Sequence, residues 1–467
     1  DYGLEYYIKD PSSFTPVRNS HKSLLLSSDS EQNKNQIAQF SRKDAQNFDK
    51  YEAMLNQIVN HLDPLIDAEP VNFPIRGRGR RFSRRDKLSF ARKSVRMLSL
   101  LRQLGLSKSM TFYELMTAPI SKILHKWFES EPLIATLATD GVIGSSFGPD
   151  SPGTGYVLLH HVMGELDGQR NAWAFVRGGM GAVSTAIASV AENLGVEIHT
   201  DCEVAEILSP KGTVTGAVLK DGTELSAPLV LSNATPAVTF LNLCSNEFLN
   251  YEFISAVRAI DYKSPVAKLN VALKSLPNFS CLPNSSDRPE PHHGTTIHLN
   301  SESVTDIQTA YAQHLLGKLP KKPLIEMTIP SSRDDSIAPA GCHVALLFTQ
   351  YAPQQLEWTE QHRNQYANAV FDSVEEYCPG FRSSIIGYEL LTPTDLEATF
   401  NLTGGNIFHG SLSSDQLLFS RPVPGYADYR TPIKGLYLCG SGAHPGGGVT
   451  GGPGRLAALA ALSDRKS

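Results

Sequence analysis

Near its C-terminus the sequence contains a glycine-dense turn whose residue types could bind a ligand. The turn follows the apolar segment Leu436–Cys439 and leads into an Ala- and Leu-rich helical segment, Arg455–Leu462. Glycine lets a backbone approach a ligand closely and adopt positive φ, and free N–H groups at a helix start favour negatively charged or electron-rich groups. We therefore predict that this turn binds such a ligand. The candidate residues are Gly440, Ser441, Gly442, Gly446, Gly447, Gly448, Val449 and Gly451.

Three segments together resemble one branch of a known enzyme family. The C-terminal turn is similar to an FAD motif, Trp173–Val183 contains Gly-Gly-Met-Gly-Ala, and Leu229–Pro236 contains Ser-Asn-Ala. All three resemble the phytoene desaturase and carotenoid isomerase-like branch of the flavin amine oxidase superfamily, and the similarity extends over nearly the whole chain. The resemblance implies a flavoprotein with FAD as its cofactor.

The resemblance also implies roles for individual residues. The backbone near Val449 would face the pyrimidine edge of the flavin, and Val204 would hydrogen-bond the adenine through its backbone. Gly178, Gly179 and Met180 would lie close to the flavin. The alternatives are an ordinary core valine at position 204 and a simple tight turn into a helix at 178–181.

The roles of two further residues of the C-terminal turn can be considered individually. Ser441 stands where many amine oxidases carry Asp, which favours the carotenoid-type branch. His444 could donate or accept a proton, because imidazole titrates near neutral pH, or it could be a structural residue hydrogen-bonded within the loop. No catalytic base is identified.

The usual opening of a dinucleotide-binding fold is not found in the sequence. Neither Gly77-Arg-Gly79 nor Gly440-Ser-Gly442 continues as G-x-G-x-x-G between an apolar strand and a helix. We therefore expect the sequence to be an N-terminally truncated piece of a longer FAD protein, with the ADP half of the site absent or supplied elsewhere. No second fingerprint indicates a dedicated NAD(P)H domain.

Composition excludes several functional classes. The 467 residues are 41% hydrophobic and 19% charged with a net charge of −5, which does not favour nucleic acid as a partner. No stretch approaches the roughly 20 apolar residues of a membrane-spanning helix. The cysteines form no C-x-x-C pair or metal-ligand spacing, which argues against a disulfide reductase and suits a reducing compartment. The pairs His160-His161 and His292-His293 lack suitable partners, so no metal site is predicted.

Apolar periodicity predicts a mixed fold. A long amphipathic helix is expected over residues 30–62, ending before Pro64, followed by helices over 88–104 and within 110–165, and by one over 183–195. Strands are expected at 197–200, 204–208, 214–219, 224–225 and 229–232, with Asp221-Gly222 as a hairpin turn. Further strands are expected at 264–274, 294–300, 322–330 and 340–351, with helices at 302–316 and 360–377.

The predicted fold class is α/β of the mixed α+β kind. It combines a Rossmann-like FAD/NAD(P)-binding domain, whose N-terminal part is missing, with a mixed-sheet substrate domain and a helical cap. We expect a mostly helical substrate or cap region at 1–165 and the middle part of the FAD-binding domain at 166–240. The substrate domain would follow at 241–400, and the C-terminal part of the FAD-binding domain at 401–467.

A cluster of basic residues lies at positions 76–93 of the sequence. It contains Arg76, Arg78, Arg80, Arg81, Arg84, Arg85, Lys87, Arg92 and Lys93. It is either a solvated loop leading into a helix or a site of contact with an anionic membrane or a nucleic acid.

The predicted function is an FAD-dependent oxidoreductase. It would remove hydride from a small apolar or amine substrate and pass electrons to oxygen or a quinone. The alternatives are a catalytically silent flavin-fold interaction protein and a redox-neutral flavin-dependent isomerase. By resemblance we expect the mitochondrial matrix as the location, a role as a regulator of mitochondrial function, contact with the inner membrane and a protein partner.

Overall fold

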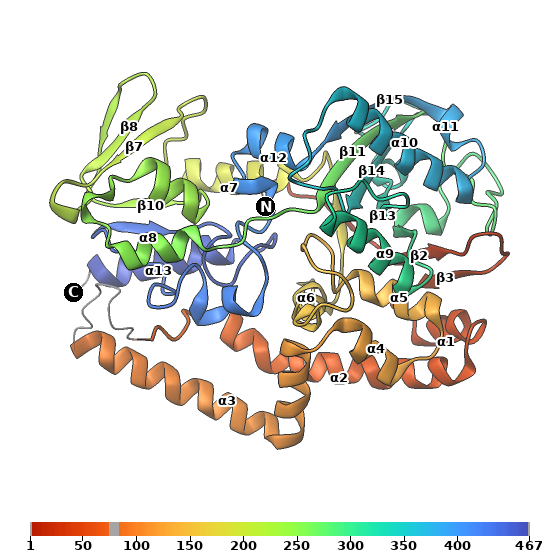
Figure 1. Cartoon of the computed structure of the whole chain (residues 1–467), viewed down its shortest axis with the longest axis horizontal. Helices are drawn as coiled ribbons and strands as arrows, with labels where there is room; N and C mark the ends of the chain where they lie inside the picture. The colour runs from red at the N-terminus through yellow and green to blue at the C-terminus, as the bar shows by residue number, and fades with distance from the viewer. Residues whose placement is uncertain (1, 74–83, 466–467) are drawn as a thin grey trace. The chain divides into compact units, whose positions relative to one another are not determined.

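The computed structural model describes residues 2–73 and 84–465 (Figure 1). The chain divides into two compact units, each built from three separate stretches. The first unit contains Asp1–Asn56, Thr117–Ile198 and Pro265–Thr394, and the second contains Gln57–Met116, His199–Ser264 and Asp395–Ser467. Both units therefore bring together segments that are far apart in the sequence.

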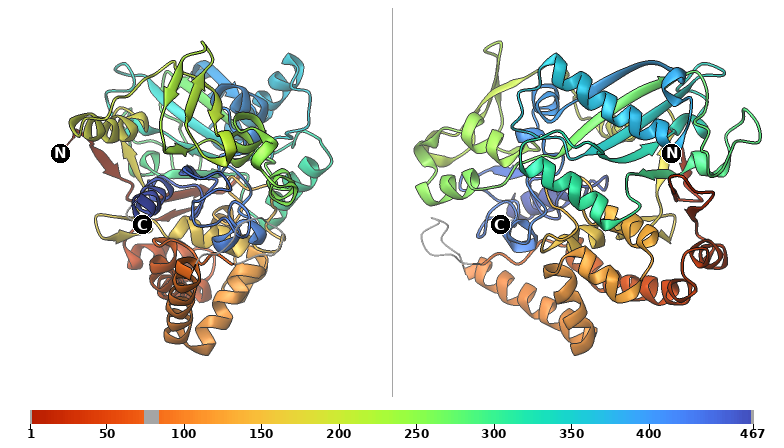
Figure 2. Two further views of the ribbon diagram at one scale, coloured as in Figure 1. Left: turned by 90° about the vertical axis from the view of Figure 1, so that its left-hand side faces the viewer. Right: turned by 45° about the vertical axis from the view of Figure 1, so that its right-hand side comes forward.

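A seven-stranded sheet forms the centre of the first unit, and Figure 2 shows it from two further sides. The strand order is β15-β11-β14-β13-β12-β2-β3, and the sheet is antiparallel except where β2 lies parallel to β12. The strands are β2 (Ser13–Pro16), β3 (Ser23–Leu26), β11 (Val266–Leu273), β12 (Thr296–Leu299), β13 (Leu324–Thr328), β14 (His343–Gln350) and β15 (Ile385–Leu391).

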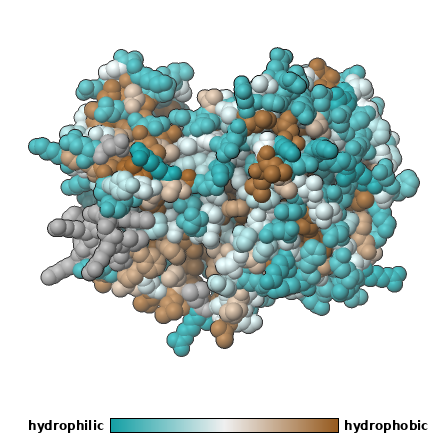
Figure 3. Space-filling model, viewed as in Figure 1, coloured by the Kyte–Doolittle hydropathy of each residue, from teal (hydrophilic) through white to brown (hydrophobic). Residues whose placement is uncertain are grey.

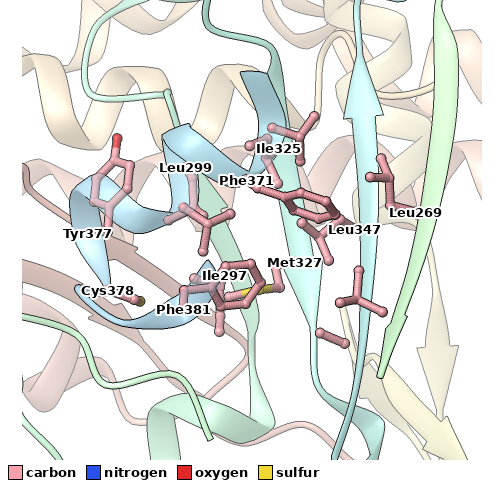
Figure 4. Close-up of a cluster of buried hydrophobic side chains, with 14 of the residues drawn as sticks. Leu269, Ile297, Leu299, Ile325, Met327, Leu347, Phe371, Tyr377, Cys378 and Phe381 are labelled. Carbon is pink, nitrogen blue, oxygen red and sulfur yellow. The ribbon is translucent and has the colours of Figure 1, made fainter. Parts of the chain in front are cut away.

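The two faces of this sheet differ because side chains alternate along a strand. One face carries the buried residues Ile297, Leu299, Ile325 and Met327, which lie in one core cluster with Phe371 of α10 (Glu360–Tyr377; Figure 4). The alternate positions His298 and Glu326 pair across β12 and β13 and point to the opposite face. The sheet therefore has an apolar core on one side and titratable side chains on the other.

Helices and short strands complete the first unit (Figure 1). The helices are α1 (Ser30–Ala38), α4 (Ile120–Trp127), α5 (Glu131–Thr139), α6 (Thr154–Val162), α7 (Gly181–Asn193), α9 (Val304–Leu315) and α11 (Phe381–Ser384). Two small antiparallel pairs are β1 (Tyr6–Ile8) with β6 (Ala174–Val176) and β4 (Glu165–Leu166) with β5 (Gln169–Arg170).

The second unit holds the C-terminal part of the chain. Its strands form the antiparallel sheet β7 (Val204–Leu208), β8 (Gly216–Leu219) and β9 (Glu224–Ser226), and the parallel pair β10 (Val230–Ser232) and β16 (Leu436–Leu438). Its helices are α3 (Arg84–Thr117), α8 (Tyr251–Arg258), α12 (Pro393–Phe400) and α13 (Gly452–Arg465), while α2 (Arg42–Ile66) crosses the boundary between the units. Its core gathers Phe240, Phe253 and Tyr426 in edge-on ring contacts beside Leu456 and Ala457 of α13.

The mixture of helix and sheet confirms the predicted α/β class, with three local corrections. The single helix expected over 30–62 is two helices, because the Ser41 hydroxyl accepts from the Asp44 N–H at 3.1 Å and starts α2 anew. Helix α2 continues past Pro64 to Ile66 instead of ending before it. Residues 197–200, expected as a strand, form no regular structure. The division into four functional segments stays a prediction, because compactness does not assign a ligand to a segment.

Candidate functional site

The glycine-dense turn connects β16 to α13 in the second unit. Strand β16 pairs in parallel with β10, with Leu436 opposite Val230 and Leu438 opposite Ser232. The ladder continues one step further, because the Cys439 N–H donates to the Ser232 carbonyl at 2.8 Å. The predicted turn and the predicted Ser-Asn-Ala segment therefore leave two neighbouring strands at the same edge.

Three glycines of the turn are required by packing. A Cβ at position 440 would lie 2.2 Å from the Asn233 carbonyl oxygen, and one at position 442 would lie 2.4 Å from Cδ of Pro236. A Cβ at position 447 would lie 2.7 Å from the ring of Phe408. These glycines thus hold the turn against the segment that follows β10.

The tip of the turn is exposed to solvent. Val449 is 75% exposed, and a Cβ at position 451 would meet no atom within 4 Å. Gly451 has φ of 65°, so its glycine is explained by backbone conformation and not by packing. Among the described residues, no acceptor pairs with the backbone N–H groups of 447–451. This run of free donors directly precedes α13, where the helix dipole also favours negative charge.

A buried arginine holds the turn through hydrogen bonds to backbone carbonyls. Arg421 is 1% exposed, and its guanidinium donates to the carbonyls of Ser441 at 2.9 Å and of Ser411 and Gln416 at 3.2 Å each. It also donates to the carbonyls of Gly410 at 3.3 Å and Phe408. The rigid five-donor guanidinium therefore ties the turn to residues 408–416. Sequence reasoning missed this residue, because no local pattern marks an arginine whose acceptors are backbone carbonyls.

His444 has a structural environment. It is 1% exposed, and its Nε2 lies 3.0 Å from the Ile66 carbonyl oxygen. Burial lowers the pKa of His444 to about 4, so the imidazole is neutral at physiological pH and its Nε2 serves as the donor to that carbonyl. Of the two open readings, this geometry favours the structural one, with the partner on α2 and not within the loop.

The remaining predicted site residues lie elsewhere. Val204 begins β7 opposite Leu219 and is 37% exposed, so it is not an ordinary core valine. Gly178 and Gly179 have φ of 73° and 93°, and the Gly178 N–H donates to Asp334 at 2.7 Å. Met180 is 52% exposed and belongs, like these glycines, to the first unit. Flavin contact by 178–180 and adenine contact by Val204 stay predictions.

The histidine, cysteine and acidic side chains were also compared with metal-binding and disulfide arrangements. Within residues 2–73 and 84–465, no group of three His, Cys, Asp or Glu side chains could hold a metal ion. All six cysteines are free thiols.

Comparison with known proteins decides the family. Residues 142–452 match the family described as flavin containing amine oxidoreductase. The chain belongs to this family. It is 49% identical over its full length to the rat pyridine nucleotide-disulfide oxidoreductase domain-containing protein 2, covering 82% of that protein. It is 27% identical to a lycopene-forming phytoene desaturase of Pseudescherichia vulneris, over 63% of this chain and 56% of that protein.

The fold of the family is also found in solved structures. Wild-type putrescine oxidase bound to putrescine matches with a TM-score of 0.54 at 10% identity, covering all of this chain and 84% of the oxidase. Because identity is this low, the match concerns the fold alone. Backbone N–H groups can donate to an electron-rich group, and contact between this turn and a flavin stays a prediction.

Proposed function

We propose that this protein is an FAD-dependent oxidoreductase of the phytoene desaturase and amine oxidase type. The observation that carries the proposal is the run of free backbone N–H groups at 447–451, placed between β16 and α13 and held by Arg421. A flavoprotein needs such donors where negative charge develops when the ring is reduced. A bound flavin supplies the hydride-accepting ring.

The chain's own residues bind and orient in this proposal. The N–H groups near Val449 would face the pyrimidine edge of the flavin, and the packed glycines Gly440, Gly442 and Gly447 would keep the turn rigid. Ser441 would offer a neutral hydroxyl to the ribityl chain, at a position where by the resemblance many amine oxidases carry Asp. Val204, Gly178, Gly179 and Met180 would contribute the further contacts implied by the resemblance.

The substrate class proposed is a small apolar or amine compound that loses hydride from a C–H bond. The relative from Pseudescherichia vulneris is a desaturase by name, which favours the apolar alternative. Electrons would pass to oxygen or a quinone.

The test is the visible absorption spectrum of protein purified from the complete reading frame. The expected result is an oxidised-flavin spectrum that disappears on reduction. Val449→Asp should lower the flavin content or make the flavin harder to reduce, because a carboxylate would stand where reduction places negative charge. Leu459→Asp, on an exposed position of α13, is the matched control and should behave as the parent protein.

Absence of flavin after reconstitution with FAD would contradict the proposal and favour the silent interaction protein. Bound flavin that supports double-bond isomerisation only after pre-reduction would favour the isomerase.

For its cellular role, we propose a mitochondrial matrix location and a part in regulating mitochondrial function, carried over from the resemblance. Protease protection of the endogenous protein in intact and ruptured mitochondria tests the location. Digestion in intact mitochondria would contradict it.

A further inference from the structure

Helix α3 exposes a row of large apolar side chains. Gly105, whose φ of 77° is not helical, divides the helix into two segments, and each segment carries such a row. In the first segment the exposed residues follow one face at spacings of seven and three, and in the second at spacings of four and three. This α3 stripe consists of Leu88, Val95, Leu98, Leu106, Met110 and Tyr113, each 60–83% exposed.

The stripe is not the face by which α3 packs on its own unit. Phe90 contacts the ring of Phe73 at 5.6 Å between centroids, and Leu104 is buried. These positions, with Met97, recur at helical spacing on the side opposite Val95 and Leu98. The first segment of α3 is therefore apolar on two opposite faces, which in a surface helix indicates a second apolar partner. Figure 3 shows apolar residues gathered along the position that α3 occupies in Figure 1.

Positive charge surrounds the stripe. The sequence from Lys87 to Tyr113 contains no acidic residue. Its exposed basic residues are Lys87, Arg92, Arg96, Arg102 and Lys108. The Arg residues of the predicted cluster at positions 76–85 lie outside the residues whose side chains are described. A protein with net charge −5 thus concentrates positive charge on the element that exposes its apolar row.

We propose that α3 docks onto an anionic phospholipid surface, lying in the plane of the interface. The apolar stripe would enter the boundary between headgroups and acyl chains, while the basic side chains contact lipid phosphates. In the described part of the chain, no helix has the length and hydropathy to cross a bilayer. The charge pattern favours anionic lipid as the occupant, because between Asp86 and Glu114 the helix carries basic residues alone and lipid phosphates can pair with them along its length.

The first experiment measures cosedimentation with phosphatidylcholine vesicles, with and without anionic phospholipid. The parent protein should bind only the anionic vesicles, and added salt should weaken the binding. The double variant Leu98→Asp with Leu106→Asp should lose binding, since both carboxylates would have to leave water beside like-charged lipid. Leu315→Asp with Leu316→Asp is the matched control, because these leucines are 64% and 70% exposed on another helix end. The control should bind as the parent does.

A charge variant separates the electrostatic contribution. Arg92→Gln with Arg102→Gln should weaken binding to anionic vesicles at least about tenfold at low salt. Lys318→Gln with Lys321→Gln, exposed basic positions outside α3, should leave it unchanged. Melting curves check that all variants fold, and none of these readouts depends on flavin.

A depth probe distinguishes insertion from simple charge attraction. Tryptophan introduced as Tyr113→Trp should be quenched by brominated acyl chains, whereas Leu316→Trp should not. The proposal is overturned if the parent protein does not bind anionic vesicles or if the stripe variant binds like the parent. It is equally overturned if light scattering shows a dimer that the stripe variant abolishes while no vesicle binding occurs, because the face would then join two copies of the chain.

Discussion

At the residue scale, Arg421 is expected to determine whether the glycine-dense turn keeps its conformation. Arg421→Lys keeps the charge but cannot reach five carbonyl groups, so several buried acceptors lose their donor. We expect a loss of about 2–4 kcal/mol in the free energy of unfolding, measured by urea denaturation. Flavin content should fall together with stability.

Arg382→Lys is the control for this prediction. Arg382 forms an ion pair with Asp372 at 2.5 Å, and its side chain is 40% exposed. Exposed pairs contribute little, so this change should cost less than about 1 kcal/mol. Equal stability of the two variants would contradict the clamp assigned to Arg421.

At the element scale, Gly105 is expected to set the course of α3. Its φ of 77° and ψ of 163° are open to glycine and strained for other residues, although nothing lies within 4 Å of a Cβ there. Gly105→Ala should therefore destabilise the protein by about 1–3 kcal/mol, measured by chemical unfolding. Gly387→Ala is the control, because that glycine lies in β15 without positive φ or a close neighbour. A stable Gly105→Ala variant with increased helix content by circular dichroism would show that the two segments of α3 join without strain.

At the scale of the whole molecule, the titratable face of the large sheet predicts how stability depends on pH. Glu326 lies 3.7 Å from His298, and its side chain is 16% exposed. Burial raises its pKa to about 8, with Asp140 acting in the same direction and Lys9 opposing it. Burial also raises the pKa of Asp140 to about 7.

The raised pKa values of the two carboxyls determine whether stability rises or falls with pH. Between about pH 6.5 and pH 8 these two carboxyls hold protons that they lose in the unfolded chain, so their contribution to stability falls as pH rises. Below about pH 6.5 His298 acts in the opposite direction, because burial lowers its pKa to about 4 and only the unfolded chain protonates it there. Burial lowers the pKa of Lys9 to about 8, so its contribution changes only above that pH and there runs in the opposite direction.

Glu326→Gln should reduce the fall in the free energy of unfolding by about 1–3 kcal/mol across this pH range, measured by urea unfolding at several pH values. The exposed Glu389→Gln, on the same sheet, should keep the slope of the parent protein. An unchanged slope in Glu326→Gln would show that the buried carboxylate does not titrate in this window.

Much of the fold could be predicted from the sequence because the patterns that indicate its elements are local. The alternation in β11 through β14, the helical period of α10 and the Asp221-Gly222 turn all depend on neighbours within a few residues. The glycine-dense turn was predictable for the same reason, since a strand, a turn and a helix follow one another directly. The family membership also follows from the sequence, through motifs that stand in it unbroken.

Only the tertiary structure decided the features that depend on distant residues. The capping hydroxyl of Ser41 divides a helix that periodicity alone joins, and Gly440 and Gly442 need to be glycines because the segment after β10 lies against them. Arg421 acquires its role from carbonyls that folding brings around it, and the α3 stripe differs from a core stripe only in which face the fold leaves uncovered. Composition and spacing set what each segment can form, whereas burial and partners exist only once the segments have packed.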